Sequence, residues 1–201
     1  MTDHSEHSPG IRLMVGLGNI GAEYQATRHN AGYWLLDAIA RRGGSRFSCE
    51  RKFHGDVAKM RIGGRDVWLL KPTTYMNRSG QSVVALALFY RIVPTEILVV
   101  HDELDLAPGV VKLKRGGGTA GHNGLKDTQT RLTTADFWRM RIGIGHPREL
   151  QLEQDVADFV LHPPRRDEQA AIDDALSRAE TVVELLAEGR FEAAMLKLHT
   201  K

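Results

Sequence analysis

Four polar residues stand where apolar runs of the sequence stop, and their types fit the hydrolysis of an acyl bond. The run "IRLMVGL" leads to Asn19, "VWLLKPTTYM" leads to Asn77, and the apolar "ILVV" stops at His101 and Asp102. If these runs are parallel strands, their carboxyl ends meet at one rim of the sheet, where open α/β sheets bind ligands. His29 lies in the loop after Asn19 and can return to the same rim.

A histidine within hydrogen-bond reach of a carboxylate is fixed in one tautomer and is stabilised as the imidazolium. It can therefore take a proton from water near neutral pH. The sequence has no G-x-S-x-G motif, and the context "RFSCERK" of the single cysteine, Cys49, does not activate a thiol. Water is then the expected nucleophile. Amide side chains at the strand ends could hold that water or the attacked carbonyl and could stabilise the developing oxyanion. This set of residues suggests acyl hydrolysis.

Each of these residues also has a simpler interpretation. His29 alone could cap or pack a turn, and asparagines such as Asn19 and Asn77 often form turns. Asp102 could be the polar end of a buried strand or a metal ligand. We predict no metal, because the sequence has no second histidine at zinc spacing and no calcium-loop spacing.

The loop "GGGTAGHNG", residues 116–124, adds His122 and Asn123 to the candidate site. It lies in a basic segment: residues 110–150 hold eight Lys or Arg and three acids, a net charge of +5, which leaves −3 for the rest of the chain. Such a concentration of charge suits a polyphosphate or a nucleic-acid backbone, although a solvated surface fits the charge equally well. The neighbours Lys112 and Lys114 favour a loop whose backbone approaches phosphate closely.

The stretch "GLGNIG", residues 16–21, has the glycine spacing of a dinucleotide-binding turn and raises the alternative of an NAD-dependent oxidoreductase. That fingerprint needs a helix directly after the third glycine and an acid at the end of the next strand. The residues after Gly21 are polar and interrupted, and Asp37 falls within the helical pattern "YWLLDAIARR". The context therefore argues against nicotinamide binding.

The elements expected to position these residues alternate between strands and helices. Strands are predicted at 11–17, 55–62, 65–72, 96–102, 110–115 and 138–145, and helices at 31–42, 79–92 and 121–132. After Pro163 and Pro164 an amphipathic pattern from Ile172 to Leu186 predicts a long helix that packs on the sheet. The alternation predicts an α/β domain with a largely parallel central sheet and one or two antiparallel hairpins.

Length and composition point to one soluble domain. The chain has 201 residues, enough for a core without disulfides, and its one cysteine excludes a disulfide framework and a four-cysteine zinc site. No apolar run approaches the length of a membrane span, and the polar start "MTDHSEHSPG" has no signal-peptide core. We expect a cytoplasmic protein with a flexible tail at residues 1–10 and one domain at 11–201. His4 and His7 belong to that tail.

Five stretches of the sequence together resemble the bacterial peptidyl-tRNA hydrolase family. These are "VGLGNIGAEYQATRHNAG", "KPTTYMNRSG", "VHDELDLAPG", "KLKRGGGTAGHNGLK" and "FWRMRIGIGHP", in the family's order and spacing from about residue 11 to 198. The resemblance implies a single-domain, three-layer α/β fold with a mixed, mostly parallel twisted sheet flanked by helices. It also implies a monomer without metal or cofactor that hydrolyses the ester between a peptide and tRNA, recycling tRNA from prematurely ended translation, with no membrane and no obligate protein partner.

Family roles carry over by motif position. His29 resembles the general base, Asp102 the acid that orients it, and Asn19 and Asn77 the pair that contacts the peptide and the reacting carbonyl or water. Asn123 resembles a further amide of the cleft, and His122 a structural or tRNA-facing group. The remaining substrate-binding positions flank the tRNA 3′ end and the peptide or meet tRNA phosphates, and they are Tyr24, Tyr75, Met76, Lys112, Lys114 and Arg141.

The sequence departs from the family at one visible position, where Ile20 replaces a usual proline. Because proline presets φ, we expect the loop that holds Asn19 to be less rigid in this chain. A second alternative also stands beside the enzyme: a catalytically silent RNA-binding scaffold with the same fold. The presence of His29, Asn19, Asn77 and Asp102 argues against it.

Overall fold

The computed structural model describes residues 8–200. His4, His7 and residues 1–7 of the predicted tail lie outside the described residues. At the other end of that predicted tail, Gly10 is buried, and a Cβ atom there would collide with the backbone of Ala187. The main-chain N–H of Ile11 donates to the carbonyl of Leu186 at 2.9 Å. The chain therefore packs against the rest of the molecule from Gly10 onward.

Within the described residues the strands form one seven-stranded sheet in the order β2-β3-β4-β1-β5-β7-β6. The central four run parallel: β4 (Arg65–Pro72), β1 (Leu13–Gly16), β5 (Ile97–Glu103) and β7 (Trp138–Gly143). The outer ones are antiparallel to their neighbours: β2 (Ser48–Glu50), β3 (Gly55–Ile62) and β6 (Val111–Arg115). The mixed, mostly parallel sheet expected from the sequence is confirmed.

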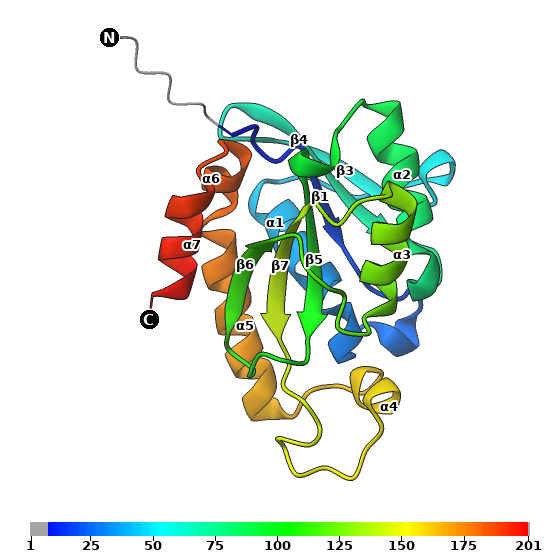
Figure 1. Cartoon of the computed structure of the whole chain (residues 1–201), viewed down its shortest axis with the longest axis vertical. Coiled ribbons are helices and arrows are strands. Elements are labelled where there is room, and N and C mark those ends of the chain that lie inside the picture. The colour runs from blue at the N-terminus through cyan, green and yellow to red at the C-terminus, as the bar shows by residue number, and fades with distance from the viewer. Residues whose placement is uncertain (1–7, 201) are drawn as a thin grey trace.

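Helices cover both faces of the sheet, which gives three layers (Figure 1). One face carries α1 (Ala31–Arg42), α5 (Arg166–Glu180), α6 (Val183–Ala187) and α7 (Phe191–His199). The other carries α2 (Ser79–Phe89) and α3 (Asn123–Leu132). The short α4 (Val156–Val160) lies apart from these layers, beyond the ends toward which the arrows of β5 and β7 point in Figure 1.

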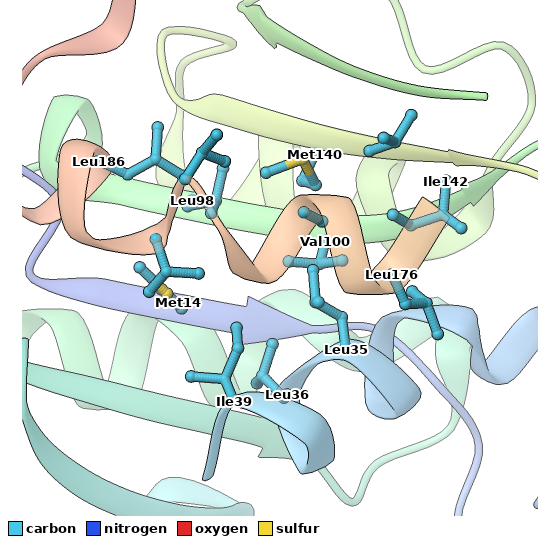
Figure 2. Packing of buried hydrophobic residues seen from close by; sticks show 14 of the residues in the cluster. Met14, Leu35, Leu36, Ile39, Leu98, Val100, Met140, Ile142, Leu176 and Leu186 are labelled. Carbon is cyan, nitrogen blue, oxygen red and sulfur yellow. The ribbon is translucent and has the colours of Figure 1, made fainter. Parts of the chain in front are cut away.

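The two faces of the sheet bury two separate apolar clusters because successive strand residues point to opposite sides. Met14 and Val100 contribute to the cluster beneath α1 and α5, whereas Leu13 and Val99 contribute to the cluster beneath α2 and α3. Figure 2 shows the first cluster, where α1, α5 and α6 direct leucine side chains onto the strands. All seven residues of β5 are buried, as expected for a central parallel strand covered on both faces.

The structure differs from the sequence prediction mainly at the C-terminus. The predicted long helix is divided into α5, α6 and α7, and Gly189 between the last two has φ +78°, which ends α6. The strand β2 and the helix α4 were not predicted. The first has three residues and the second five, and both are shorter than the stretch over which a hydrophobic period can be recognised.

One glycine sets the distance between α1 and the strand ends. A Cβ atom at Gly32 would lie 2.4 Å from the carbonyl oxygen of Val100 and 2.5 Å from backbone atoms of Leu17. Because only glycine permits this approach, the first turn of α1 lies directly against β5 and the end of β1. The residues that precede α1, including His29, are thereby brought to the carboxyl end of β5.

Candidate functional site

A cleft of about 330 Å³ opens at the carboxyl end of β5. The end of β5, the glycine-rich loop before α3 and the helix α4 form its walls. The lining residues are His29, His101, Asp102, Glu103, Leu104, Thr119, Ala120, Gly121, His122, Asn123, Asp155, Val156, Ala157 and Val160. Four residues singled out from the sequence, His29, Asp102, His122 and Asn123, therefore meet in one cleft.

The carboxylate of Asp102 lies at the centre of this group and contacts two histidines. His29 Nδ1 lies 2.9 Å from Oδ2 and 3.1 Å from Oδ1, and His122 Nε2 lies 2.8 Å from Oδ1. The Asp102 side chain is only 3% exposed, so water cannot replace these partners. The two imidazole rings are 5.0 Å apart at their centroids.

The hydrogen bonds assign a tautomer to each ring. His122 is the N-cap of α3, where its Nδ1 accepts the main-chain N–H groups of Gly124 and Leu125 at 3.2 and 3.4 Å. Its Nε2 must therefore carry the proton that it donates to Asp102. Asp102 likewise accepts the Nδ1–H of His29, which leaves Nε2 of His29 unprotonated. A free Nε2 lone pair in the cleft is what a general base requires.

The charges in the group depend on one another. Burial by itself would raise the pKa of Asp102, but attraction and hydrogen bonds from His29 and His122 hold that pKa well below its usual range. Burial likewise opposes the imidazolium form of His29. The adjacent Asp102 charge and hydrogen bond outweigh that effect, so the pKa of His29 is raised above its ordinary 6.5. Asp102 therefore stabilises the protonated product of a general-base step.

The neighbouring His101 does not compete for this proton. Its side chain is 1% exposed, and its Nδ1 donates to the carbonyl oxygen of Asp102 at 2.8 Å. Burial, together with repulsion from His122, lowers the pKa of His101 to about 3. His101 remains neutral at physiological pH and adds no second positive charge behind the carboxylate.

Asn30 holds the main chain of Asn19 from two sides. Its Oδ1 accepts the N–H of Asn19 at 2.8 Å, and its Nδ2 donates to the carbonyl of Asn19 at 3.0 Å. Ile20, at the position of the usual proline, is 59% exposed. A buried side-chain clamp thus restrains this loop, which the loss of proline was expected to loosen.

Asn19 and Asn77 do not line the cleft that holds Asp102, as far as the described residues go. Asn77 is exposed on a 3₁₀ turn, Met76–Arg78, that packs against the start of α3. Met76 in this turn is 7% exposed and belongs to the apolar core. Its side chain lies against Gly124. The turn that carries Asn77 and the start of α3 that carries Asn123 are therefore neighbours, although Asn123 lines the cleft and Asn77 does not.

The two tyrosines lie outside that cleft too. Tyr24 is half-buried in the 3₁₀ turn Ala22–Tyr24, and Tyr75 is 79% exposed. Their expected roles in substrate binding stay predictions.

The basic residues project from the sheet edge on the side away from α7. In β6, Val111 and Leu113 point into the core under the C-terminal helices, so Lys112 and Lys114 face the opposite side. Lys112 is exposed, and the side chain of Lys114 reaches over Gly117. The side chain of Arg141 is held by a hydrogen bond, because its Nε donates to Oε2 of Glu103 at 2.9 Å.

The ligating atoms of His29, Asp102 and His122 lie within 4.8 Å of one another, close enough to hold a metal ion. Sequence spacing did not reveal this cluster, because the fold brings the second histidine from a distant loop. The hydrogen bonds disfavour a metal here. A ligand nitrogen needs a free lone pair, whereas Nε2 of His122 carries a proton while its Nδ1 caps α3.

The structure agrees with the rejection of a nicotinamide site. After Gly21 the chain forms short 3₁₀ turns, and α1 begins only at Ala31. No helix N-terminus therefore follows the glycine turn, and Asp37 lies within α1, where it pairs with Lys71 at 2.6 Å.

Neither the second partner of Asp102 nor the clamp on Asn19 was predicted from the sequence. His122 was expected to be structural or to face tRNA, and Asn30 was not singled out. The motif "GHNG" gives a signal for the first, because a histidine that precedes a helix can act as N-cap with one nitrogen and reach a partner with the other.

The chain is similar in sequence to known peptidyl-tRNA hydrolases. The family model "Peptidyl-tRNA hydrolase" matches residues 13–201. A peptidyl-tRNA hydrolase of Bordetella avium is 60% identical over 197 residues, 98% of this chain and 95% of the relative. One from Cupriavidus pinatubonensis is 57% identical over 195 residues, 94% of this chain and 98% of the relative.

A solved structure is also similar to this chain in fold. The crystal structure of peptidyl-tRNA hydrolase from Acinetobacter baumannii matches with a TM-score of 0.90 and 47% sequence identity, covering 96% of each chain. Between residues 8 and 200, none of the helices combines the length and the apolar character needed to cross a membrane.

The raised pKa of His29 can be tested directly. Replacing Asp102 with Asn removes the charge that raises this pKa but leaves the burial that lowers it. We expect the imidazole of His29 to titrate above 6.5 in the wild type and at a lower pH in Asp102→Asn, followed by NMR across about pH 5 to 9. Asp105→Asn, at an exposed acid in the turn after β5, is the control and should leave the titration unchanged. An unmoved His29 titration in Asp102→Asn would contradict the assignment.

Proposed function

The chain belongs to the peptidyl-tRNA hydrolase family and is an enzyme that hydrolyses peptidyl-tRNA, and we propose that His29 is the general base of this reaction. The hydrogen bond of 2.9 Å between His29 Nδ1 and the buried Asp102 is the observation that supports the proposal most strongly. It leaves Nε2 of His29 free to take a proton in the cleft.

In the proposed reaction, Nε2 of His29 takes a proton from water as the water oxygen attacks the ester carbonyl carbon. The resulting tetrahedral intermediate collapses with cleavage of the bond between that carbon and the 3′ oxygen of the tRNA ribose. The imidazolium of His29 then returns the proton to this oxygen. Asp102 stabilises the imidazolium and keeps the ring in place, without itself taking the proton.

The oxyanion of the intermediate needs hydrogen-bond donors, and the amide side chains are suited to supply them. Asn123 lines the same cleft as His29. We assign it to the cleft wall, and we assign Asn19 and Asn77 to the peptide and the reacting carbonyl or water. Tyr24, Tyr75 and Met76 belong to the surroundings of the peptide and the tRNA 3′ end. For His122 we favour positioning of Asp102 over contact with the substrate.

The phosphates of tRNA would meet Lys112, Lys114 and Arg141. Lys112 and Lys114 project from the open face of an edge strand. Lysines at a sheet edge also prevent pairing with other chains, so their position alone does not require a phosphate partner. The net charge of +5 in residues 110–150 supports the phosphate role.

The broader setting follows from the substrate. We propose that the protein acts in the cytoplasm, where translation produces peptidyl-tRNA, and recycles tRNA from prematurely ended translation. We also propose that it acts as a monomer without an obligate protein partner and that residues 11–201 work as one domain. A histidine, a carboxylate and water are sufficient for ester hydrolysis, so the proposed reaction uses no cofactor.

Loss of the base should abolish most of the activity. We expect His29→Ala to lower turnover of peptidyl-tRNA by at least about 10²-fold while the protein stays folded, since general-base catalysis typically contributes this much. Asp102→Asn should lose less, because the base itself remains. The measurement is single-turnover cleavage, with folding checked by circular dichroism.

The matched control for this loss is His54→Asn, at an exposed histidine whose positive φ asparagine tolerates. Near-normal cleavage by His29→Ala would show that another group takes the proton. Wild-type protein that binds the RNA without cleaving it would favour the silent scaffold.

Removal of metal ions should leave the reaction unchanged. The proposed mechanism has no metal in it, and the proton on Nε2 of His122 disfavours coordination by the cluster around Asp102. We expect the same rate of hydrolysis before and after exhaustive chelation. Full inhibition that one added cation reverses would contradict this mechanism and would assign the cluster to that cation.

The phosphate contacts should appear in the salt dependence of binding. Lys112→Ala and Lys114→Ala should each raise KM for peptidyl-tRNA and lower the slope of log KM against log salt by about one unit or slightly less, while maximal turnover is retained. Arg141→Ala should change the slope less, because Glu103 already compensates part of the arginine charge.

Lys197→Ala, on α7 at the opposite face of the sheet, is the control for charge loss. Short aminoacyl esters without the tRNA body should be hydrolysed equally by the wild type and the lysine variants. Equal slopes in all these proteins would mean that the basic segment is an ordinary surface.

A further inference from the structure

We propose that Arg28 is a positioning residue that fixes the α4 wall of the cleft to the turn that carries His29. Arg28 directly precedes His29 in the 3₁₀ turn Arg28–Asn30. The inference concerns the placement of the cleft wall and rests on the proposed role of His29 only for its effect on catalysis.

The guanidinium of Arg28 is buried in an ion pair with α5. Its Nη2 lies 3.1 Å from Oε2 of Glu168, and both side chains are only 4% exposed. The same Oε2 accepts the main-chain N–H of Arg165 at 2.6 Å, so Glu168 also caps the first turn of α5. The pair therefore joins the turn before α1 to the start of α5.

The other side of the guanidinium holds the end of α4. Its Nη1 donates to the carbonyl oxygens of Phe159 at 3.0 Å and His162 at 3.2 Å, and the main-chain N–H of Arg28 donates to the same His162 carbonyl at 3.2 Å. The ring of Phe159 lies 3.8 Å from Cζ of Arg28. A positive charge at a helix C-terminus and a cation–π contact both stabilise this arrangement.

The helix held in this way has little stability of its own. It spans five residues, Val156–Val160, far fewer than an isolated helix needs in water. Three of these residues, Val156, Ala157 and Val160, line the cleft opposite the glycine-rich loop. The position of this wall thus depends on its tertiary contacts, and Arg28 supplies two hydrogen bonds, an ion pair and a ring contact in one side chain.

Arg28→Lys keeps a positive charge opposite Glu168, so it does not leave the buried carboxylate without an opposite charge, a loss that would destabilise the whole protein. The geometric consequence of this substitution is larger, because the planar guanidinium bonds Phe159 in α4, His162 just after α4 and Glu168 in α5 at once, and a lysine ammonium cannot reproduce that fork. We therefore expect loss of the fork to release α4 more than it destabilises the whole protein.

The test compares Arg28→Lys and Glu168→Gln with Arg12→Lys. Arg12 is the control, because its guanidinium also bonds one carboxylate, that of Glu96, and two carbonyls, those of Tyr90 and Arg91. It is more exposed than Arg28 and lies just before β1, away from the cleft. Hydrogen exchange measured by mass spectrometry follows residues 156–162, and the His29 titration and kcat/KM are measured in parallel.

We expect Arg28→Lys to speed exchange in residues 156–162 by at least about tenfold, with smaller changes in α5 and α2. Its kcat/KM should fall on the order of tenfold, since small displacements of a cleft wall have effects of this size, while the pKa of His29 stays unchanged because Asp102 is intact. Glu168→Gln should act in the same direction, and Arg12→Lys should change neither.

Wild-type exchange in residues 156–162 of Arg28→Lys would overturn the proposal. So would an equal increase in exchange across α2, α5 and α4, which would indicate a general structural role. The exchange result does not depend on catalysis. A failure of His29→Ala to lose activity would therefore contradict the proposed base and leave the positioning of α4 by Arg28 to be decided by exchange alone.

Discussion

The buried carboxylate of Asp102 is the constraint on which the rest of the site depends. A charge removed from water is stable only when hydrogen bonds and opposite charges replace its hydration. Here the donors are His29, from the turn before α1, and His122, from the N-cap of α3. The turn before α1 and the loop before α3 must therefore both reach the carboxyl end of β5. The same two bonds fix the histidine tautomers, and the free Nε2 of His29 is a consequence of that arrangement.

The elements that present Asp102 could be predicted because their hydrophobic patterns are long. The predicted bounds of the central strands agree with the observed ones to within a few residues, and the predicted helix at 31–42 has the bounds of α1. Prediction failed where a hydrophobic pattern does not show where one helix ends and the next begins. Apolar residues recur from Ile172 to Leu186, but the helix breaks before α6 and again at Gly189, because packing of each short helix on the sheet overrides a continuous period.

The candidate site was predictable in part for a similar reason. Polar residues directly after apolar runs, such as Asp102 near the carboxyl end of β5, are placed by topology alone, and the family motifs supplied their proposed roles. Contacts made by side chains across loops have no such signal. Neither the clamp of Asn30 on Asn19 nor the bonds from Arg28 to the end of α4 follow from spacing, because the partners of Arg28 lie more than a hundred residues away.

The glycine-rich loop links the basic surface to the carboxylate of Asp102. Arg139 is buried at 1% exposure beneath it and donates to the carbonyls of Gly117 and Gly118. Lys114 reaches over this part of the loop, and the loop ends at His122, which contacts Asp102. These bonds restrain the backbone of the loop, since loss of either would leave a donor of the buried guanidinium without that acceptor, which is costly. The proposed phosphate contact at Lys114 and the proposed proton transfer at His29 would therefore share one rigid support, and binding of the tRNA backbone would position the ester relative to the base.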